Sequence, residues 1–245
     1  MKRAIILAGG RGVRLRPYTV ALPKPLMPIG EYPILEVIIR QLVAHRFTHI
    51  TLAVNHQADI IKAFFQDGAK WGITIDYSFE TKPLSTMGPL KLIRNLPDNF
   101  LVMNGDVVSD VDYAQFLDEH TKRNSIFSIL AHNRQEKVDY GVLKVQGGGH
   151  KKYPCILSGF EEKPVNNYLV SMGIYAVSKH VLDYIPEDTP FGFDTLMQTF
   201  LASDIEVNVT PYDGYWLDIG RPDDYIRATE EFDSIKHSLN IGEQF

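Results

Sequence analysis

A run of glycines set among cations stands near the amino end of the chain. It reads Leu7-Ala8-Gly9-Gly10-Arg11-Gly12-Val13-Arg14-Leu15, and Arg16 and Lys24 follow it. Glycines in such a run let backbone N–H groups approach phosphate oxygens closely. The forked donors of arginine and the point charge of lysine also suit a polyphosphate. The run predicts a site for the phosphate chain of a nucleotide, and an ordinary tight strand-to-helix turn is the alternative for the glycines alone.

Two common phosphate-binding motifs are excluded by the same run. No Gly-Lys-Ser/Thr follows it, as a Walker P-loop requires. Leu15 stands where the dinucleotide-binding fingerprint needs its third glycine. A dinucleotide-dependent oxidoreductase is therefore not supported.

Two aspartates follow apolar segments that read as strands. Asp106 closes Asn104-Gly105-Asp106, and Asp218 lies within Trp216-Leu217-Asp218-Ile219-Gly220. Mg²⁺ prefers one or two carboxylates together with phosphate oxygens and water. Taken singly, each aspartate could instead cap or orient a turn. If the fold brings both to the phosphate site, they form a magnesium site.

Formal charge is distributed unevenly along the chain. The whole chain is −5, but residues 1–30 hold six Lys and Arg and no acid, so this segment is +6 and the remainder −11. We therefore expect an anionic ligand near the amino end. A basic stripe interleaved with aromatic residues is missing, so a small polyphosphate fits better than nucleic acid.

The elements that must position these residues alternate between strand and helix in the first half. Strands are expected at 4–8, 48–54, 73–79 and 100–104, with helices at 34–45 and 58–70 and a short helix before the last strand. This order indicates an α/β fold with a central mixed, mostly parallel sheet. Ligands of such sheets bind beyond the carboxyl ends of the strands, where the glycine run lies.

The second half is richer in strands. Strands are expected at 126–131, 141–145, 156–161, 169–177 and 206–211, with helices at 113–123, 178–184, 194–201 and 222–238. Gly147 to Gly149 look like a hairpin tip. No linker or repeat divides the chain, so we expect one domain, 1–245. Residues 1–130 would form a nucleotide-binding half and 131–245 the other wall of a cleft.

Composition excludes several protein classes. The 245 residues are 44% apolar and 22% charged, which is too apolar for a disordered chain. No apolar run approaches the roughly 18 residues needed to cross a bilayer, so no membrane partner is expected. Cys155 is the only cysteine and cannot form an intrachain disulfide, which agrees with a cytoplasmic protein.

The glycine run, extended to Arg16-Pro17-Tyr18-Thr19 and followed by Pro23-Lys24-Pro25-Leu26, closely resembles the signature of sugar-1-phosphate nucleotidyltransferases. Further matches occur in the family's order at Glu80-Thr81-Lys82-Pro83-Leu84, Asn104-Gly105-Asp106, Tyr140-Gly141, Glu162-Lys163-Pro164 and Trp216 to Gly220. The resemblance implies a Rossmann-like fold. It also implies that a nucleoside triphosphate and a sugar 1-phosphate react to give a nucleotide sugar and pyrophosphate, with Mg²⁺ as the cofactor. The additional modules of longer relatives do not fit within 245 residues, so a monomer or homodimer is expected.

The resemblance also implies roles for individual residues, with 131–245 as the sugar-phosphate-binding half. The catalytic set would be Arg14, Lys24, Asp106, Lys163 and Asp218, with both aspartates binding the metal. The nucleotide would contact Leu7, Ala8, Gly9, Gly10, Gly12, Arg14, Lys24, Glu80, Gly88 and Asp106. The sugar phosphate would contact Gly141, Glu162, Lys163 and Ser171. An exposed ion pair in a strand-to-turn segment is the alternative for Glu162 and Lys163.

Glu80 opens the loop that faces the base in relatives. A carboxylate can accept both N1–H and N2–H of guanine, whereas uracil and thymine suit glutamine better. The stretch 80–90 also resembles the guanylyltransferases for mannose, glucosamine and heptose 1-phosphate, so GTP is the first choice. Uridylyl, thymidylyl and cytidylyl transfer remain alternatives.

Two departures from the family pattern bear on specificity. Ser85 and Met87 replace the small residues that leave room beside the nucleotide, and Ser171 replaces an asparagine that commonly contacts the sugar. The sequence therefore leaves the sugar open. From a different class, a nucleotide-sugar-sensing regulatory subunit without turnover is the competing hypothesis, and the joint presence of the five catalytic residues argues against it.

Overall fold

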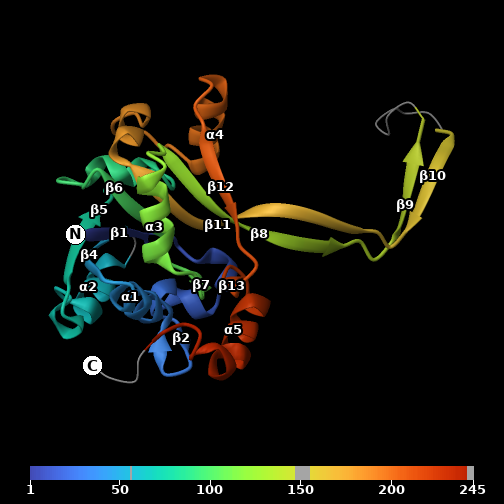
Figure 1. Ribbon diagram of the computed structural model, residues 1–245. Coiled ribbons are helices and arrows are strands. Elements are labelled where there is room, and N and C mark those ends of the chain that lie inside the picture. Colours follow the sequence, from blue (N-terminus) through green and yellow to red (C-terminus); the bar gives the residue numbers. More distant parts are fainter. Residues whose placement is uncertain (56, 147–154, 242–245) are drawn as a thin grey trace.

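A computed structural model describes residues 1–55, 57–146 and 155–241. A seven-stranded sheet with the order β12-β8-β11-β6-β1-β4-β5 forms its middle (Figure 1). Four neighbour pairs are parallel, and β11 runs antiparallel to both of its neighbours, so the predicted mixed, mostly parallel sheet is confirmed. The strands are β1 (Lys2–Leu7), β4 (Phe47–Val54), β5 (Thr74–Phe79), β6 (Asn99–Asn104), β8 (Phe127–Lys137), β11 (Val165–Ser178) and β12 (Val207–Pro211).

Helices cover both faces of this sheet because its central strands are apolar on both sides. In β1, Ile6 faces one core with residues of α1, α2, α3 and α5, while Ile5 faces the other with residues of α4. In Figure 1, α4 lies above the sheet, and α1, α2 and α5 lie below it. The helices are α1 (Ile34–Ala44), α2 (Ala58–Phe65), α3 (Tyr113–Lys122), α4 (Phe193–Ala202) and α5 (Pro222–Ile235).

Smaller elements connect the layers. Three two-stranded sheets pair β2 (Pro28–Ile29) with β3 (Tyr32–Pro33), β7 (Val107–Ser109) with β13 (Trp216–Asp218), and β9 (Gly141–Val145) with β10 (Leu157–Glu162). Short 3₁₀ helices are η1 (Val13–Leu15), η2 (Tyr18–Val20), η3 (Lys24–Leu26), η4 (Ala69–Trp71), η5 (Gly88–Leu92) and η6 (Lys179–Tyr184). The β7–β13 pair matters most, because it brings the chain's second half back to the end of β6.

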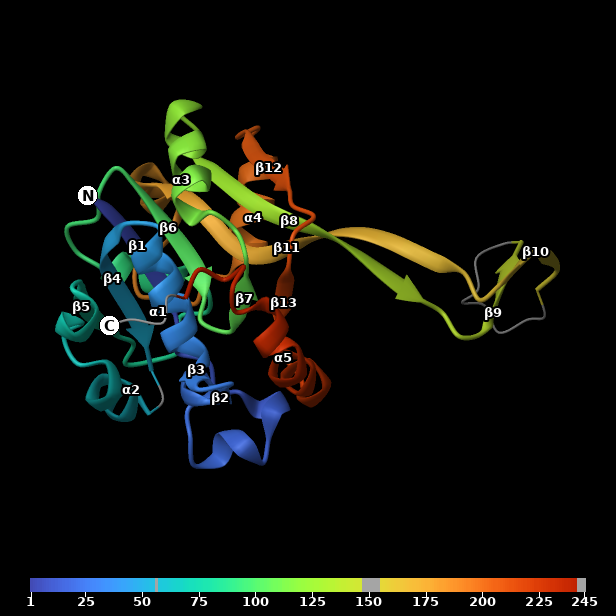
Figure 2. The ribbon, with the colours of Figure 1, turned by 60° about the horizontal axis from the view of Figure 1, so that its bottom comes forward.

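The long strands β8 and β11 differ most from expectation. Both continue past the sheet as a two-stranded ribbon, with β9 and β10 beyond it, and project away from the body (Figures 1 and 2). We call residues 132–146 and 155–170 the arm. The predicted hairpin tip at 147–149 lies outside the described residues. Within the described ranges, no helix is long and apolar enough to span a membrane.

Two predicted helices are also shorter or tighter than expected. The helix expected at 58–70 ends at Phe65, because Gln66 has a positive φ of 49° and Gly68 one of 85°. The helix expected at 178–184 is the 3₁₀ helix η6.

Candidate active site

The glycine run leaves the sheet between two neighbouring strands. The N–H of Ala8 donates to the carbonyl of Ala53 at the end of β4 (2.8 Å), and the N–H of Gly105 donates to the carbonyl of Leu7 (3.0 Å). The run then turns at Gly12, whose φ is +58°. Its carbonyl accepts from Oγ1 of Thr19 at 2.7 Å, which ties η1 to η2. The run therefore lies at the carboxyl edge of the parallel strands, as predicted.

A cavity of about 440 Å³ opens at this edge. Five residues predicted to bind the nucleotide line it: Leu7, Gly9, Gly10, Glu80 and Asp106. The other lining residues were not among the predicted nucleotide ligands, although the sequence placed Ser85 beside the nucleotide. They are Arg11, Ala53, Asn55, Pro83, Ser85, Thr86, Pro89 and Asn104. Asn55 and Asn104 stand at the ends of β4 and β6, so the rule that ligands bind at strand ends could have found them.

The two predicted metal-binding aspartates converge on one place. In the β7–β13 pair, Asp218 lies opposite Val107, and the N–H of Ile219 donates to the carbonyl of Asp106 at 3.0 Å. Adjacent antiparallel strand ends thus place the two carboxylates beside one another, although more than one hundred residues separate them in sequence.

Two predicted cations lie with these carboxylates. Lys24, which is only 8% exposed, forms an ion pair with Oδ2 of Asp106. Arg14 lies beside Asp218: a Cβ built on Gly220 would be 3.5 Å from Oδ1 of Asp218 and 3.6 Å from both terminal nitrogens of Arg14. The structure therefore brings together four of the five predicted catalytic residues.

Burial raises the pKa of Asp218, and the negative charge of Asp106 raises it further, while Lys24 and Arg14 act in the opposite direction. A divalent cation would relieve the repulsion between the two carboxylates. Two hard oxygen donors, with phosphate oxygens and water completing the shell, are a set that Mg²⁺ accepts. No cluster of three acidic, histidine or cysteine side chains suited to a metal occurs among the residues the structure describes. A cation held by the two aspartates would therefore take its other ligands from substrate oxygens and water.

Glu80 follows β5 and points toward the glycine run. A Cβ built on Gly9 would lie 3.0 Å from its Oε1, and its Oε2 accepts from the N–H of Leu84 at 3.0 Å. Burial raises the pKa of Glu80, and the Leu84 hydrogen bond lowers it. One carboxylate oxygen therefore faces the cavity while the other is held by the loop it opens.

The two unusual residues of this loop behave differently. Ser85 lines the cavity with a positive φ of 64°, whereas Met87 is fully buried in the core beside α4 and takes no space from a nucleotide. The N–H groups of Met87 and Gly88 both donate to the carbonyl of Phe191, at 2.9 and 3.0 Å. Gly88 thus lies behind the cavity as part of the loop's attachment, and sequence reasoning missed the segment 189–193 that supplies this attachment.

The residues predicted to bind the sugar phosphate do not lie at the cavity. Gly141, Glu162 and Lys163 are exposed at the far part of the arm, and Lys163 has a positive φ of 46° at the turn between β10 and β11. Ser171 is exposed at the arm's base, where its Oγ donates to the hydroxyl of Tyr175 at 3.2 Å. Residues 131–245 were expected to form the other wall of the cleft. Within them, β13 and α5 lie near the glycine run, whereas the arm leads away from it (Figure 2).

The six cations of the first thirty residues lie at two different places, two at the start of β1 and four beyond its end. Lys2 pairs with Asp118 at 2.8 Å, and Arg3 donates to Thr51 and to carbonyls of residues 94 and 95, at the opposite end of β1 from the cavity. The other four cations follow β1 and stand on the side of the glycine run: Arg11, Arg14, Arg16 and Lys24.

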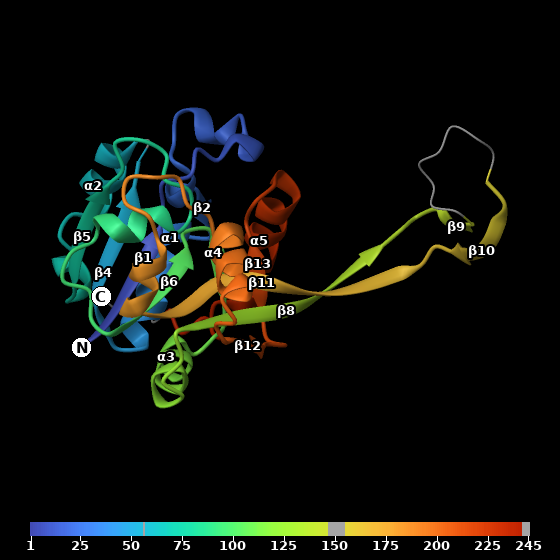
Figure 3. The ribbon, with the colours of Figure 1, turned by 90° about the horizontal axis from the view of Figure 1, so that it is seen from above.

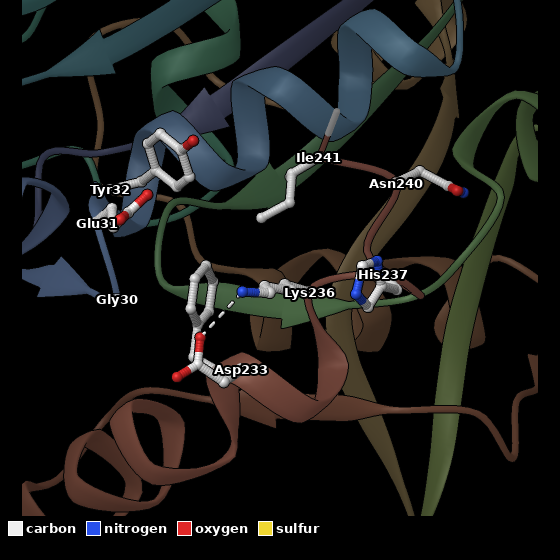
Figure 4. A pocket seen from close by; sticks show the side chains of 9 residues that line it. Gly30, Glu31, Tyr32, Asp233, Lys236, His237, Asn240 and Ile241 are labelled. Atoms are coloured by element: carbon white, nitrogen blue, oxygen red, sulfur yellow. Dashed lines mark hydrogen bonds and ion pairs between the residues drawn. The ribbon is translucent and has the colours of Figure 1, made fainter. Parts of the chain in front are cut away.

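A larger cavity of about 690 Å³ lies elsewhere. It separates the β2–β3 hairpin from the end of α5, where Tyr32 faces Lys236 and Ile241 (Figure 4). It shares no lining residue with the cavity at the strand ends. The larger cavity is therefore not the candidate site. The converging charged groups identify the smaller cavity at the strand ends instead.

Comparison with known proteins agrees with this geometry. Residues 3–234 match the family described as Nucleotidyl transferase. The chain is 34% identical over 235 residues to the mannose-1-phosphate guanyltransferase of Yarrowia lipolytica, and 35% identical over 233 residues to probable mannose-1-phosphate guanylyltransferase 1 of Oryza sativa subsp. japonica. These alignments cover 93% and 91% of this chain, which spans 63% of the length of each relative.

Solved structures show the same fold. The crystal structure of HddC from Yersinia pseudotuberculosis has a TM-score of 0.71 and 28% identity, and covers 95% of this chain and 100% of its own. HddC has also been solved in complex with GMP-PN, with a TM-score of 0.69, 26% identity and the same coverage. From its matching sequence, its fold and its strand-end site, the chain belongs to the nucleotidyl transferase family.

Proposed function

We propose that this protein transfers a guanylyl group from GTP to a sugar 1-phosphate, giving a GDP-sugar and pyrophosphate. The observation that carries the proposal is the convergence of Asp106, Asp218, Lys24 and Arg14 beside a cavity at the carboxyl ends of parallel strands. The curated relatives named above are mannose-1-phosphate guanyltransferases, which supports the same reaction class.

The chemistry requires two anions to be held together. An oxygen of the sugar phosphate forms a bond to the α-phosphorus of GTP, and the bond from that phosphorus to the bridging oxygen of the β-phosphate breaks. Pyrophosphate leaves with the electron pair, and no proton transfer is needed because the sugar phosphate is already ionised. The protein's task is therefore alignment and neutralisation of charge.

The residues at the strand ends can perform this task. The backbone N–H groups of the glycine run face the phosphates, and Arg14 stabilises the charge that develops on pyrophosphate. Lys24 is held in place by Asp106 and needs little reorganisation to bind a phosphate oxygen. Asp106 and Asp218 would hold Mg²⁺, which when bound neutralises phosphate charge and orients the triphosphate.

Glu80 supports guanine as the base. Its free Oε1 faces the cavity, and a desolvated carboxylate that accepts N1–H and N2–H of guanine discriminates against a wrong base by about 1–3 kcal/mol. The burial of Met87 removes one of the two side chains that would have restricted the base.

The direct test is pyrophosphate release with Mg²⁺ over GTP, UTP, dTTP, CTP and ATP, each combined with mannose, glucosamine, heptose and glucose 1-phosphates. We expect turnover that is highest with GTP. Asp218→Asn should abolish it, while the matched control Asp183→Asn, at a side chain 79% exposed in η6, should not. Nucleotide binding without turnover in any combination would overturn the proposal and assign the protein to the nucleotide-sugar-sensing class.

A further inference from the structure

The arm is exposed on both of its faces. None of its described residues is buried, so side chains on both sides of each strand face solvent. Large apolar side chains are prominent among them, with exposed fractions from 48% to 79%. They are Tyr140, Leu143, Ile156, Leu157, Phe160, Val165, Tyr168 and Leu169.

Such a ribbon needs a surface to pack against. A two-stranded ribbon alone is at best marginally stable in water, and contiguous exposed apolar patches mark interaction sites. The arm is nevertheless regularly hydrogen-bonded: Val165 to Ser171 pair in register with Lys137 to Ala131. Its regular strand pairing and its apolar surface together indicate that another protein surface covers it.

The arm does not reach its own site. Seven paired residues of β11 extend the ribbon by about 20 Å at roughly 3.3 Å per residue, and Lys163 lies beyond them. The pairing of β8 with β11 is regular along the arm and shifts its register between Ser171 and Tyr175, where the arm leaves the central sheet. In all three views the arm points away from the body (Figures 1, 2 and 3).

The site in turn lacks a cation for the second substrate. Arg11 is the one basic side chain among the described residues that line the cavity, while Arg14 and Lys24 already stand beside the two aspartates. A triphosphate and a sugar phosphate together carry more negative charge than these groups neutralise. Glu162 and Lys163, at the turn between β10 and β11, would supply a hydroxyl acceptor and a phosphate ligand.

We propose that two copies of this chain exchange arms, so that Lys163 and Glu162 of the partner copy complete the sugar-phosphate side of each site. This inference rests on the proposed function. Exchange between two identical chains is reciprocal, because each chain gives its arm to the other. Both sites are then completed and both arms are covered in a single dimer.

The body offers a matching surface beside the glycine run. Val13, Tyr18 and Val20 are 54%, 56% and 66% exposed on η1 and η2, and the ring of Tyr18 lies 5.9 Å from that of Tyr225 in α5. Apolar side chains of the arm can cover this surface. The acidic Glu162 would then approach the segment that carries Arg11, Arg14 and Arg16.

Complementation between two inactive variants tests the exchange. Lys163→Ala and Asp218→Asn chains, carrying different affinity tags, are co-expressed and the mixed dimer is isolated through both tags. Each variant alone should lose at least about 100-fold in turnover. The mixed dimer should recover about half of the wild-type activity per chain, because one intact body then receives one intact arm. A mixed dimer as inactive as its parents, or failure of the two chains to copurify, would overturn the proposal.

A second measurement does not depend on turnover. Sedimentation should show wild type as a dimer at micromolar concentration, and Leu143→Ser/Phe160→Ser as a monomer with an unchanged circular dichroism spectrum. The matched control is Leu201→Ser, at a side chain 77% exposed on α4, which should stay dimeric. A monomeric wild type, or a dimeric arm variant, would contradict the exchange. If the wild type is dimeric through its arms but inactive with every substrate, only the proposed function fails.

Discussion

Asp106 and Asp218 lie side by side but differ in their electrostatic surroundings. Asp106 has Lys24 as an ion-pair partner. Burial and the negative charge of Asp106 both disfavour the ionised form of Asp218, and the pKa of its carboxyl is raised as a result. In the absence of a cation, the ionised form of Asp218 therefore destabilises the folded protein. The site thus holds unfavourable electrostatic energy that a bound cation would release.

This difference predicts opposite effects on stability from two similar substitutions. A carboxyl with a raised pKa contributes stability below its ordinary value of 3.8, and this stability is lost as the pH rises through the folded value. At pH 8 without Mg²⁺, Asp218→Asn should therefore raise Tm by about 2–4 °C for each kcal/mol of repulsion removed. Asp106→Asn should lower Tm, because it leaves Lys24 buried without its carboxylate.

Thermal scans at pH 4 and pH 8, without metal, check both effects. The gain from Asp218→Asn should shrink toward pH 4. Added Mg²⁺ should raise Tm of the wild type and leave both variants unchanged. A lower Tm for Asp218→Asn at pH 8, or equal Mg²⁺ stabilisation of all three proteins, would contradict this account of the site.

Glu80→Gln tests base recognition. The amide presents one acceptor and one donor, so the ratio of kcat/KM for GTP to that for UTP should fall about 5- to 150-fold, the equivalent of 1–3 kcal/mol. The Glu80 carboxyl must be ionised to accept both guanine donors, and its pKa is raised. In the wild type, kcat/KM for GTP should therefore rise with pH through a value above the ordinary one for glutamate. Glu80→Gln should lack this limb, and an unchanged preference for GTP in the variant would remove Glu80 from base recognition.

At the scale of elements, the loop that follows Glu80 is attached to the body at several points. The N–H of Phe191 donates to the carbonyl of Leu84 at 2.9 Å, and the N–H of Phe193 donates to Oγ1 of Thr86 at 2.8 Å. With the two bonds to the carbonyl of Phe191, these fix the loop against the start of α4. A base bound by Glu80 would therefore lie against a loop that four hydrogen bonds attach to the body.

Two glycines of the glycine run differ in whether a side chain would fit at their position. A Cβ on Gly12 would lie 2.8 Å from Cγ2 of Thr19, at a φ of +58° that costs an alanine about 1–2 kcal/mol. A Cβ on Gly10 would meet nothing within 4 Å, although Gly10 lines the cavity. Gly12→Ala should therefore lower Tm by several degrees. Gly10→Ala should keep Tm within about 1 °C and raise KM for the nucleotide. Thermal scans and nucleotide titrations separate the two effects, and equal stability of the two variants would contradict the predicted strain.

At the scale of the whole molecule, four cations of the first thirty residues, Arg11, Arg14, Arg16 and Lys24, stand on the side of the glycine run. Screening shortens the reach of this charge, because the Debye length falls from roughly 10 Å at 0.1 M salt to roughly 3 Å at 1 M. KM for the nucleotide should therefore rise several-fold over this range. Arg11→Gln should flatten the dependence, since Arg11 lines the cavity. Lys2→Gln, whose lysine pairs with Asp118 at the other end of β1, should not, and an equal change in both would show that net charge alone matters.

Much of the fold and half of the site could be predicted from local patterns. Apolar periodicity located β1, β4, β5, β6, α1, α3, α4 and α5 to within a few residues, because each element's own side chains encode its period. It placed the start of α2 correctly but its end five residues too late. Parallel strands present their carboxyl ends at one edge, so the order of strands along the chain was enough to place the glycine run and Asp106 together. The family's order of motifs then placed Asp218 with them.

Tertiary structure alone decided the remaining features, because each depends on which distant surfaces meet. The ion pair of Lys24 with Asp106, the burial of Met87 and the attachment of the base loop to residues 189–193 join segments about 80 to 110 residues apart. Strand periodicity could not show that β8 and β11 continue beyond the sheet, since a ribbon and a sheet edge share one alternation. That continuation places Lys163 outside the cavity, and this placement is the observation from which we propose the exchange of arms.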